Sequence, residues 1–205
     1  MRIPLPKLRE LAEALRAVFG RRFTTRFPKA VDSVDPNFRG MLEFIDEKCM
    51  CCGACSQVCP TNARELVVDR DKGMMRSIHH AERCIYCGQC VLYCPTKALK
   101  HTTDFDASRT ERSADWETSV EKELAYCESC GEPFAARQQL LHIAHRVGDL
   151  VSSNPTLFLT LYEDQGLALP AQPGRGEEMP YRSGLMRVLC PECRRKVYLH
   201  EEWGY

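Results

Sequence analysis

Apolar residues recur at helical spacing near the start of the chain. Residues 5–19 carry them on one face and charged residues on the other, and Gly20 stands where such a helix would end. The helix is therefore predicted to be amphipathic. It either packs on its own domain or lies as a foot on a membrane surface or an integral-membrane partner. The basic residues Arg21, Arg22 and Arg26 that follow favour the second interpretation.

The apolar pattern becomes shorter after this helix. From residue 23 to residue 40 the sequence is typical of an extended arm, because Pro28 and Pro36 prevent a regular helix. Short runs that predict β-strands come next. They are expected at residues 42–46, 66–69, 74–79 and 98–102, with a turn at residues 69–73.

The second half of the chain is predicted to be less regular. Residues 103–126 are polar and acidic, and we interpret them as a linker that becomes helical around Trp116–Leu124. An apolar stripe predicts a helix at residues 133–147, and closely spaced prolines and glycines predict loops beyond it. The expected fold class is α+β, in four parts. They are a helix and docking arm (1–40), a mixed domain (41–102), the acidic linker (103–126) and a C-terminal module (127–205).

The mixed domain contains the same cysteine motif twice. The copies begin at Cys49 and Cys84, and each has the form C-x2-C-x2-C-x3-C-P. An offset of 35 residues superimposes the two copies and also matches Gly53 with Gly88. Glycine suits a tight loop whose backbone must approach a bound group closely. The two copies therefore form an internal repeat, which predicts two equivalent sites.

The spacing is typical of iron–sulfur ligation, since soft iron selects thiolate ligands. In two-cluster ferredoxins the fourth cysteine of each run ligates the other cluster. A bacterial-type ferredoxin domain with two [4Fe-4S] clusters and crossed ligands is therefore predicted. The first cluster is assigned to Cys49, Cys52, Cys55 and Cys94, and the second to Cys84, Cys87, Cys90 and Cys59. Zinc sites or disulfides are the alternative, which two complete four-cysteine runs disfavour.

Other residues near the two runs also have predicted roles. Cys51 is left over from the four-cysteine register and is expected to be a small buried residue beside the first cluster. We interpret His79 and His80 as half-exposed strand residues, in preference to groups that tune a cluster or move protons. Apolar residues next to the ligands are expected to exclude water. They are Val58, Ile85, Val91, Leu92 and Tyr93.

The C-terminal module contains two further cysteine pairs. They are Cys127-x2-Cys130 and Cys190-x2-Cys193. If the fold brings these distant pairs together, they form a closed four-sulfur site of the zinc-ribbon type, with no open position for a substrate. Zinc is the favoured metal, and a single rubredoxin-like iron is the alternative. His142 and His145 are expected to be surface or packing residues, since four cysteines already complete the site.

Composition and charge indicate in which cellular compartment the protein works and which partners it can have. The 13 cysteines, without a recognisable secretory leader, favour metal ligands in a reducing compartment over disulfides. No apolar stretch approaches the ~20 residues of a membrane-spanning helix. Residues 1–30 hold eight Lys or Arg and two Glu within a chain of zero net charge, which indicates a basic docking end on an acidic body. The small basic patch at residues 194–196 does not predict nucleic-acid binding.

Segments outside the cysteine runs carry a family resemblance. The basic stretch Phe19–Pro28 and the arm segment Asn37–Gly40 resemble the ferredoxin-like subunit of respiratory complex I. The two C-terminal cysteine pairs, which that subunit lacks, resemble the ferredoxin-like subunit of formate hydrogenlyase and of related energy-converting, membrane-bound [NiFe] hydrogenases. Such subunits relay single electrons through two clusters. The resemblance implies a peripheral protein on the cytoplasmic face of the cell membrane.

The hydrogenase resemblance also implies partners. They are the hydrogenase small and large subunits, a peripheral iron–sulfur subunit that donates electrons, and an integral-membrane subunit contacted through residues 1–40. The sequence has no nucleophile with a base, paired-carboxylate site or phosphate loop, so the chain is expected to relay electrons rather than catalyse. The equivalent subunit of a complex I-type quinone oxidoreductase is the main alternative. A free ferredoxin or a regulator is a weaker one, because neither has a use for the N-terminal helix and arm.

Overall fold

The computed structural model of this protein describes residues 7–21, 24, 27, 34–106, 116–175 and 186–203, without the side chains of residues 200–203. The chain divides into two compact units, residues 1–38 and residues 39–205. Some sequence expectations lie outside the described residues. They concern Arg22, Arg26 and Pro28 in the N-terminal part, residues 107–115 of the predicted linker, and Pro180.

The first unit contains helix α1, Leu8–Phe19. This confirms the predicted helix, which ends at Gly20 as expected. Glu10 stabilises its first turn, because the carboxylate accepts a hydrogen bond of 3.0 Å from the backbone N–H of Lys7. No residue of α1 is buried, and the side chains of Leu8 and Phe19 are 87% and 84% exposed. The apolar face of α1 is therefore uncovered within this unit.

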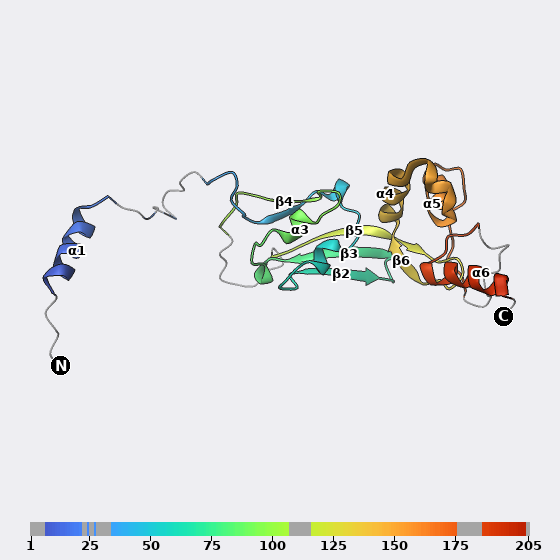
Figure 1. The fold of residues 1–205 in the computed structure, drawn as a ribbon, viewed down its shortest axis with the longest axis horizontal. Helices are drawn as coiled ribbons and strands as arrows, with labels where there is room; N and C mark the ends of the chain where they lie inside the picture. Colours follow the sequence, from blue (N-terminus) through green and yellow to red (C-terminus); the bar gives the residue numbers. More distant parts are fainter. Residues whose placement is uncertain are drawn as a thin grey trace, which may run out of the picture. The chain divides into compact units, whose positions relative to one another are not determined.

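The second unit contains two antiparallel sheets that carry the repeated motif (Figure 1). In the smaller sheet, β1 (Leu42–Phe44) pairs with β4 (Leu99–His101). In the larger sheet, β2 (Arg64–Asp69) and β3 (Met74–His80) form a hairpin. The four strands predicted for the mixed domain are confirmed, each to within two residues at its ends.

The repeat in the sequence is also a repeat in the backbone. The two strand pairs have equivalent registers: Leu42 pairs with His101 in the smaller sheet, and Ser77 pairs with Leu66 in the larger. Both of these pairs are related by the same 35-residue offset as the cysteine runs. Each cysteine run is therefore accompanied by one antiparallel pair of strands, and the two pairs have the same register.

Each cysteine loop continues into a one-turn helix. These helices are α2 (Ala54–Gln57) and α3 (Gln89–Leu92). The residue before each helix is a glycine in the left-handed region, Gly53 with φ of 76° and Gly88 with φ of 79°. Because a side chain at these positions would be strained, the two glycines allow the loops to turn tightly around the sites described below.

Strand β5 is the main departure from the sequence prediction. The expected helix around Trp116–Leu124 is wrong, because Glu117–Tyr126 forms a ten-residue strand. It pairs antiparallel with β3 and with β6 (Pro133–Ala136), which gives the larger sheet the order β2-β3-β5-β6. The predicted linker thus ends in a central strand that joins the cysteine-rich domain to the C-terminal module.

The side chains of β5 alternate as a strand requires. Val120 and Leu124 are buried on one face. On the other face, Glu117 and Glu121 lie 3.7 Å and 2.9 Å from the guanidinium of Arg76 on β3. The acidic residues that suggested a solvated linker are therefore the exposed face of a sheet, where cross-strand ion pairs offset their charge.

The C-terminal module is more helical than the sequence predicted. The helix expected at 133–147 begins four residues later, as α4 (Arg137–Val147), because its first residues form β6 instead. A 3-10 segment, Gly148–Ser153, and helix α5 (Pro155–Asp164) occupy part of the predicted loop region. Helix α6 (Pro191–Trp203) ends the described chain.

The core of the larger sheet connects the two halves of this unit. Met75, Val120, Leu124 and Ala136 are buried together with Cys51. Helix α4 buries Leu140, Leu141 and Ala144. Cys51 is 2% exposed, so it is the small buried residue that the sequence predicted.

A close backbone approach at Gly40 gives a first testable prediction. A Cβ atom at this position would overlap the backbone carbonyl oxygens of Thr102 and Asp104, which have no freedom to move aside. We expect Gly40→Ala to lower the free energy of unfolding by about 2 kcal/mol. Gly166→Ala is the matched control, since its Cβ would meet open space and only the positive φ would cost, at about 1 kcal/mol. Thermal unfolding of both variants measures the difference, and equal midpoints would contradict it.

Candidate metal centres

The eight cysteines of the two runs line two separate cavities. The space free of protein atoms in and around each cavity, open solvent included, is about 340 Å³ for the first and about 320 Å³ for the second. The cysteines of the two runs around the first are Cys49, Cys52, Cys55 and Cys94, and Cys51 also lines this cavity. Those around the second are Cys59, Cys84, Cys87 and Cys90. Each cavity thus collects three cysteines of one run and the fourth cysteine of the other, which are the same sets that the sequence grouped together.

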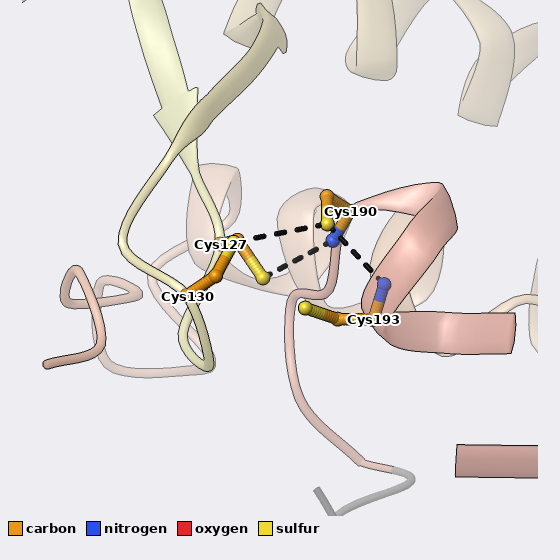
Figure 2. Close-up of side chains that lie close together, drawn as sticks. All are labelled: Cys127, Cys130, Cys190 and Cys193. Atoms are coloured by element: carbon orange, nitrogen blue, oxygen red, sulfur yellow. Dashed lines mark hydrogen bonds between the residues drawn. The ribbon is translucent and has the colours of Figure 1, made fainter. Parts of the chain in front are cut away.

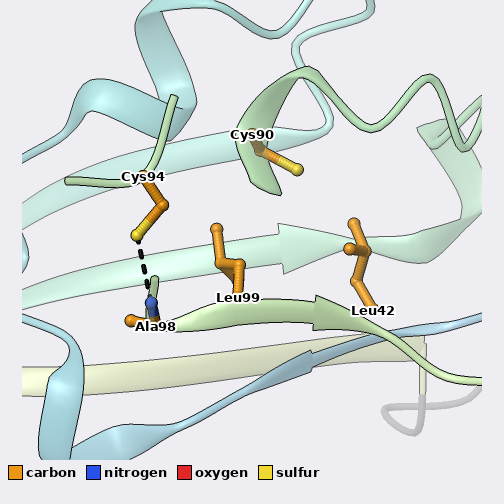
Figure 3. Close-up of a cluster of buried hydrophobic side chains, with 5 residues drawn as sticks. All are labelled: Leu42, Cys90, Cys94, Ala98 and Leu99. Carbon is orange, nitrogen blue, oxygen red and sulfur yellow. Dashed lines mark hydrogen bonds between the residues drawn. The ribbon is translucent and has the colours of Figure 1, made fainter. Parts of the chain in front are cut away.

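Backbone N–H groups point at the sulfur atoms of both fourth cysteines. The N–H of Ala63 donates to Sγ of Cys59 at 3.2 Å, and the N–H of Ala98 donates to Sγ of Cys94, also at 3.2 Å. Figure 3 shows the second of these bonds beside Cys90 and the apolar side chains of Leu42 and Leu99. Donors aimed at sulfur favour the thiolate form, which is the form that binds metal.

The two thiol sets fit a thiolate-bound metal group in their electrostatics as well. All thirteen cysteines lie in the described residues, and none forms a disulfide. Burial raises the pKa of Cys52, Cys84 and Cys90 above the usual thiol value. The charge of Arg64 opposes this effect at Cys84 and Cys90. Thiols that resist ionisation in a partly apolar cavity become stable ligands when a bound metal supplies the compensating charge.

Cys51 lies beside the first set without being part of either. A hydrogen bond with the Cys51 thiol is the main reason why the pKa of Cys49 is lowered to about 6. The same contact raises the pKa of Cys51, and the Cys51 thiol also donates to the carbonyl oxygen of Val120 at 3.6 Å. Cys51 therefore remains protonated and supports Cys49 as a thiolate.

Two expectations about the surroundings of the second set are wrong. His79 is only 1% exposed, not half-exposed, because its side chain lies on the face of β3 that lines the second cavity beside Arg64. Burial is also the main cause that lowers the pKa of His79 to about 4. Ile85, Leu92 and Tyr93 are 62%, 63% and 58% exposed, so they do not exclude water in this chain alone. Leu92 and Tyr93 line neither cavity, whereas Ile85 lines the second cavity although most of its surface is exposed.

The C-terminal cysteines form a different kind of site. The Sγ atoms of Cys127, Cys130, Cys190 and Cys193 all lie within 4.8 Å of one another (Figure 2). The separation between Cys130 and Cys190 is 3.9 Å. A Zn–S bond of about 2.3 Å in a tetrahedron places sulfur atoms about 3.8 Å apart, so this spacing fits one ion. Neither His142 nor His145 belongs to this group among the residues that the structure describes.

Local hydrogen bonds explain how the fold brings these distant pairs together. The first pair lies in the turn between β5 and β6, and the second lies at the start of α6. The backbone N–H of Cys190 donates to Sγ of Cys127 at 3.3 Å, and that of Cys193 donates to Sγ of Cys190 at 3.4 Å. Two hydrogen bonds between Glu128 and Val188 connect the segment that carries the first cysteine pair to the segment that carries the second.

Helix α5, which the sequence did not predict, also supports this site. The hydroxyl group of Thr156 donates to the carbonyl oxygen of Leu189 at 3.0 Å and accepts a hydrogen bond from the guanidinium of Arg194 at 2.8 Å. Thr156 is 6% exposed. The turn that carries Cys190 is therefore held from the side as well as by its own cysteines.

Comparison with known proteins assigns the cysteine-rich part of the chain. The 4Fe-4S dicluster domain family matches residues 48–98, which contain all eight cysteines of the two cavities. This part of the chain is therefore a 4Fe-4S dicluster domain of mixed helix and sheet content. The predicted two-cluster ferredoxin character of this region is confirmed at that level.

Two further comparisons each match part of this chain. NADH-quinone oxidoreductase subunit I of Carboxydothermus hydrogenoformans is 28% identical over 71 residues, which are 35% of this chain and 51% of that protein. The chain thus spans about half the length of the curated relative that it matches. A chain in the structure of the membrane-bound sulfane sulfur reductase (MBS), an archaeal respiratory membrane complex, is 24% identical. It has a TM-score of 0.39, and the match covers 54% of this chain and 60% of that one. Among the described helices, none combines the length and the apolar character needed to cross a membrane.

Proposed function

We propose that this protein relays single electrons through two [4Fe-4S] clusters as a subunit of a membrane-associated oxidoreductase complex. The observation that carries the proposal is the gathering of eight cysteines into two cavities, each with a fourth ligand from the other run. The first cluster is bound by Cys49, Cys52, Cys55 and Cys94, and the second by Cys84, Cys87, Cys90 and Cys59. Such clusters supply one-electron chemistry, and the protein has to supply position, burial and hydrogen bonds to sulfur.

The C-terminal four-cysteine site is proposed to be structural. Its sulfur atoms are spaced for one tetrahedral ion, and a four-thiolate site leaves no open position for a substrate. Zinc is the proposed ion, and a rubredoxin-like iron is the alternative. Metal analysis of anaerobically prepared protein separates them: about eight irons and about one zinc per chain are expected, whereas about nine irons without zinc indicate the alternative.

Residues 1–40 are proposed to dock the chain on the membrane arm of its complex. The apolar residues of α1, Leu11, Leu15 and Val18 among them, are all exposed within their unit. The basic residues of this end suit a membrane surface or an integral-membrane subunit on the cytoplasmic side. The proposed role thus explains a helix whose apolar face has no cover of its own.

The docking role predicts the effect of charging that face. The double variant Leu11→Glu and Leu15→Glu is expected to weaken association with its membranes by at least about 100-fold, since burying each leucine contributes about 1.5–3 kcal/mol. Glu13→Gln, on the polar face, is the control and is expected to bind as the natural chain does. Sedimentation with the protein's own membranes measures both. Equal binding of the double variant and the control would exclude α1 as the anchor.

We propose the ferredoxin-like subunit of a formate hydrogenlyase-like, membrane-bound [NiFe] hydrogenase as the particular role. The additional four-cysteine module supports this choice over the complex I-type subunit, and the likeness of part of the chain to NADH-quinone oxidoreductase subunit I supports that alternative. The proposed partners are the hydrogenase small and large subunits, an electron-donating iron–sulfur subunit and an integral-membrane subunit.

Purification of the chain with its partners tests this role. The tagged protein is isolated anaerobically from its own membranes in mild detergent, and the proteins that accompany it are identified by mass spectrometry. A [NiFe] large subunit among them would support the hydrogenase role, and a quinone-reducing module without nickel would support the complex I-type role. Recovery of the chain alone from the soluble fraction would contradict both and indicate a free ferredoxin or a regulator.

A further inference from the structure

The two cluster sites are related by the repeat, so the positions where their linings differ are informative. Phe44 and Leu99 line the first cavity. The residues at the equivalent positions of the second cavity are His79 and Arg64. An apolar pair in one site is thus replaced by a polar and charged pair in the other. No other pair of equivalent lining residues introduces a full charge.

Arg64 is buried without a protein partner for its donors. The residue is 4% exposed, and the nitrogen atoms Nε, Nη1 and Nη2 have no hydrogen-bond partner among the described residues. Its guanidinium lies 4.3 Å from the centre of the Phe44 ring, which neutralises no charge and accepts no strong hydrogen bond. A buried arginine normally has a paired anion and satisfied N–H groups. The environment of Arg64 therefore lacks an acceptor that carries negative charge.

A thiolate-bound iron–sulfur cluster in the second cavity has the properties of that acceptor. Arg64 lines this cavity with Cys59, Cys84 and Cys90. After burial, its charge is the second cause that acts on the pKa of Cys90, whereas it is the smallest of the five causes at Cys49 of the first set. Cluster sulfides and thiolates accept hydrogen bonds, and the whole centre is an anion that gains a further negative charge when it is reduced. A guanidinium keeps its positive charge at every accessible pH, so its attraction is stronger for the reduced centre.

We propose that Arg64 donates hydrogen bonds to the cluster bound by Cys84, Cys87, Cys90 and Cys59, and thereby gives it the higher reduction potential of the two. This inference rests on the proposed function, because it requires a cluster in the second cavity. Hydrogen bonds to sulfur and nearby positive charge both favour the reduced form. Leu99 offers neither to the first cluster, although its position is equivalent.

The consequence is a direction for the electron within the pair. When one electron enters the two oxidised clusters, it resides mainly on the second cluster and leaves the first oxidised. Passing the electron from the first to the second cluster oxidises one by one electron and reduces the other by one, with no proton or bond exchanged. Arg64 acts in this step as a residue that sets the potential.

Substitution of Arg64 tests the proposal on the whole protein. Arg64→Leu places the residue of the first site into the second, Arg64→Lys keeps the charge, and Arg76→Leu removes an arginine on β3 that is ion-paired outside both cavities. Each is titrated with reductant under anaerobic conditions and followed by electron paramagnetic resonance. We expect Arg64→Leu to lower the reduction equilibrium constant of one cluster at least tenfold, which is about 59 mV for one electron. Arg64→Lys is expected to keep most of that constant, and Arg76→Leu to change neither cluster appreciably.

Two further measurements identify the cluster and guard against loss of the cofactor. The first is nuclear hyperfine spectroscopy of the reduced natural protein after labelling its arginines with nitrogen-15, which is expected to detect coupling to one cluster only. The second is the same Arg64→Leu titration in a Cys94→Ala chain, in which the second cluster is expected to remain and to show the shift. Absence of nitrogen-15 coupling would overturn the proposal, as would unchanged potentials in Arg64→Leu with about eight irons bound. An unaltered chain without iron or cluster signals would instead overturn the proposed function, so the two failures are distinguishable.

Discussion

Replacing Cys94 with alanine is expected to remove the cluster of the first cysteine run and to preserve that of the second. Cys94 belongs to the second run, but its sulfur lies in the first cavity with Cys49, Cys52 and Cys55. A [4Fe-4S] cluster with only three thiolates loses a ligand that alanine cannot replace. The iron content should therefore fall from about eight to about four per chain in the clusters, with one paramagnetic species left on reduction.

The reciprocal variant and a neutral one complete this experiment. Cys59→Ala is expected to remove the other cluster, so its remaining signal should differ from that of Cys94→Ala. Cys51→Ser is the control, because Cys51 lies next to Cys49 but belongs to neither set, and both clusters should persist. Cys49→Ala identifies the signals, because with crossed ligation it should leave the same signal as Cys94→Ala. If Cys94→Ala instead retained the signal that Cys49→Ala loses, each run would bind its own cluster. The crossed assignment would then be wrong.

Replacing Cys190 with alanine is expected to release the C-terminal metal while both clusters remain. The four sulfur atoms of this site are spaced for a single ion, and the loss of one ligand opens the site. Because structural zinc binding contributes folding free energy directly, on the order of 10 kcal/mol in small zinc modules, the segment around α5 and α6 should unfold in this variant. Bound zinc should fall from about one to near zero, while about eight irons remain.

Thermal stability and protease sensitivity test whether the C-terminal metal is structural. The first unfolding transition of Cys190→Ala should shift to lower temperature, and limited proteolysis should cleave after the end of β5. His142→Ala is the control, since His142 lies on α4 outside the four-sulfur group, and its metal content should match that of the natural chain. Retention of zinc by Cys190→Ala would exclude the four-cysteine zinc site. A fall in iron from about nine to about eight per chain, without any loss of zinc, would identify a rubredoxin-like iron instead.

The cysteine-rich domain was predictable because its local pattern and its tertiary structure agree. The 35-residue offset that relates Cys49 to Cys84 also relates Gly53 to Gly88, and the structure repeats it in the strand registers. The N-terminal helix was also predictable from the sequence, since the spacing of its apolar residues and the position of Gly20 are local signals.

Strand β5 was not predictable in the same way. In Glu117–Tyr126 the buried residues Val120 and Leu124 lie on one face of the strand. The acidic residues between them make the segment look polar throughout, so the sequence does not indicate a buried face. The conformation of β5 depends on β3, which supplies both the hydrogen-bonding edge and the countercharge of Arg76. Helix α5 is a similar case, because Thr156 contacts Leu189 33 residues away. Neither partner is visible from the local sequence.

The sequence alone predicts thiolate ligands for the metals of this protein, because metal-binding loops are short and their cysteine spacing is a local property. It also predicts the number of cluster sites and an amphipathic N-terminal helix. Three features follow from the three-dimensional fold alone: Cys127 and Cys190 meet, His79 is buried, and Arg64 occupies the position that Leu99 has in the other site. These features depend on residues brought together from distant parts of the chain, and spacing within one segment carries no information about them.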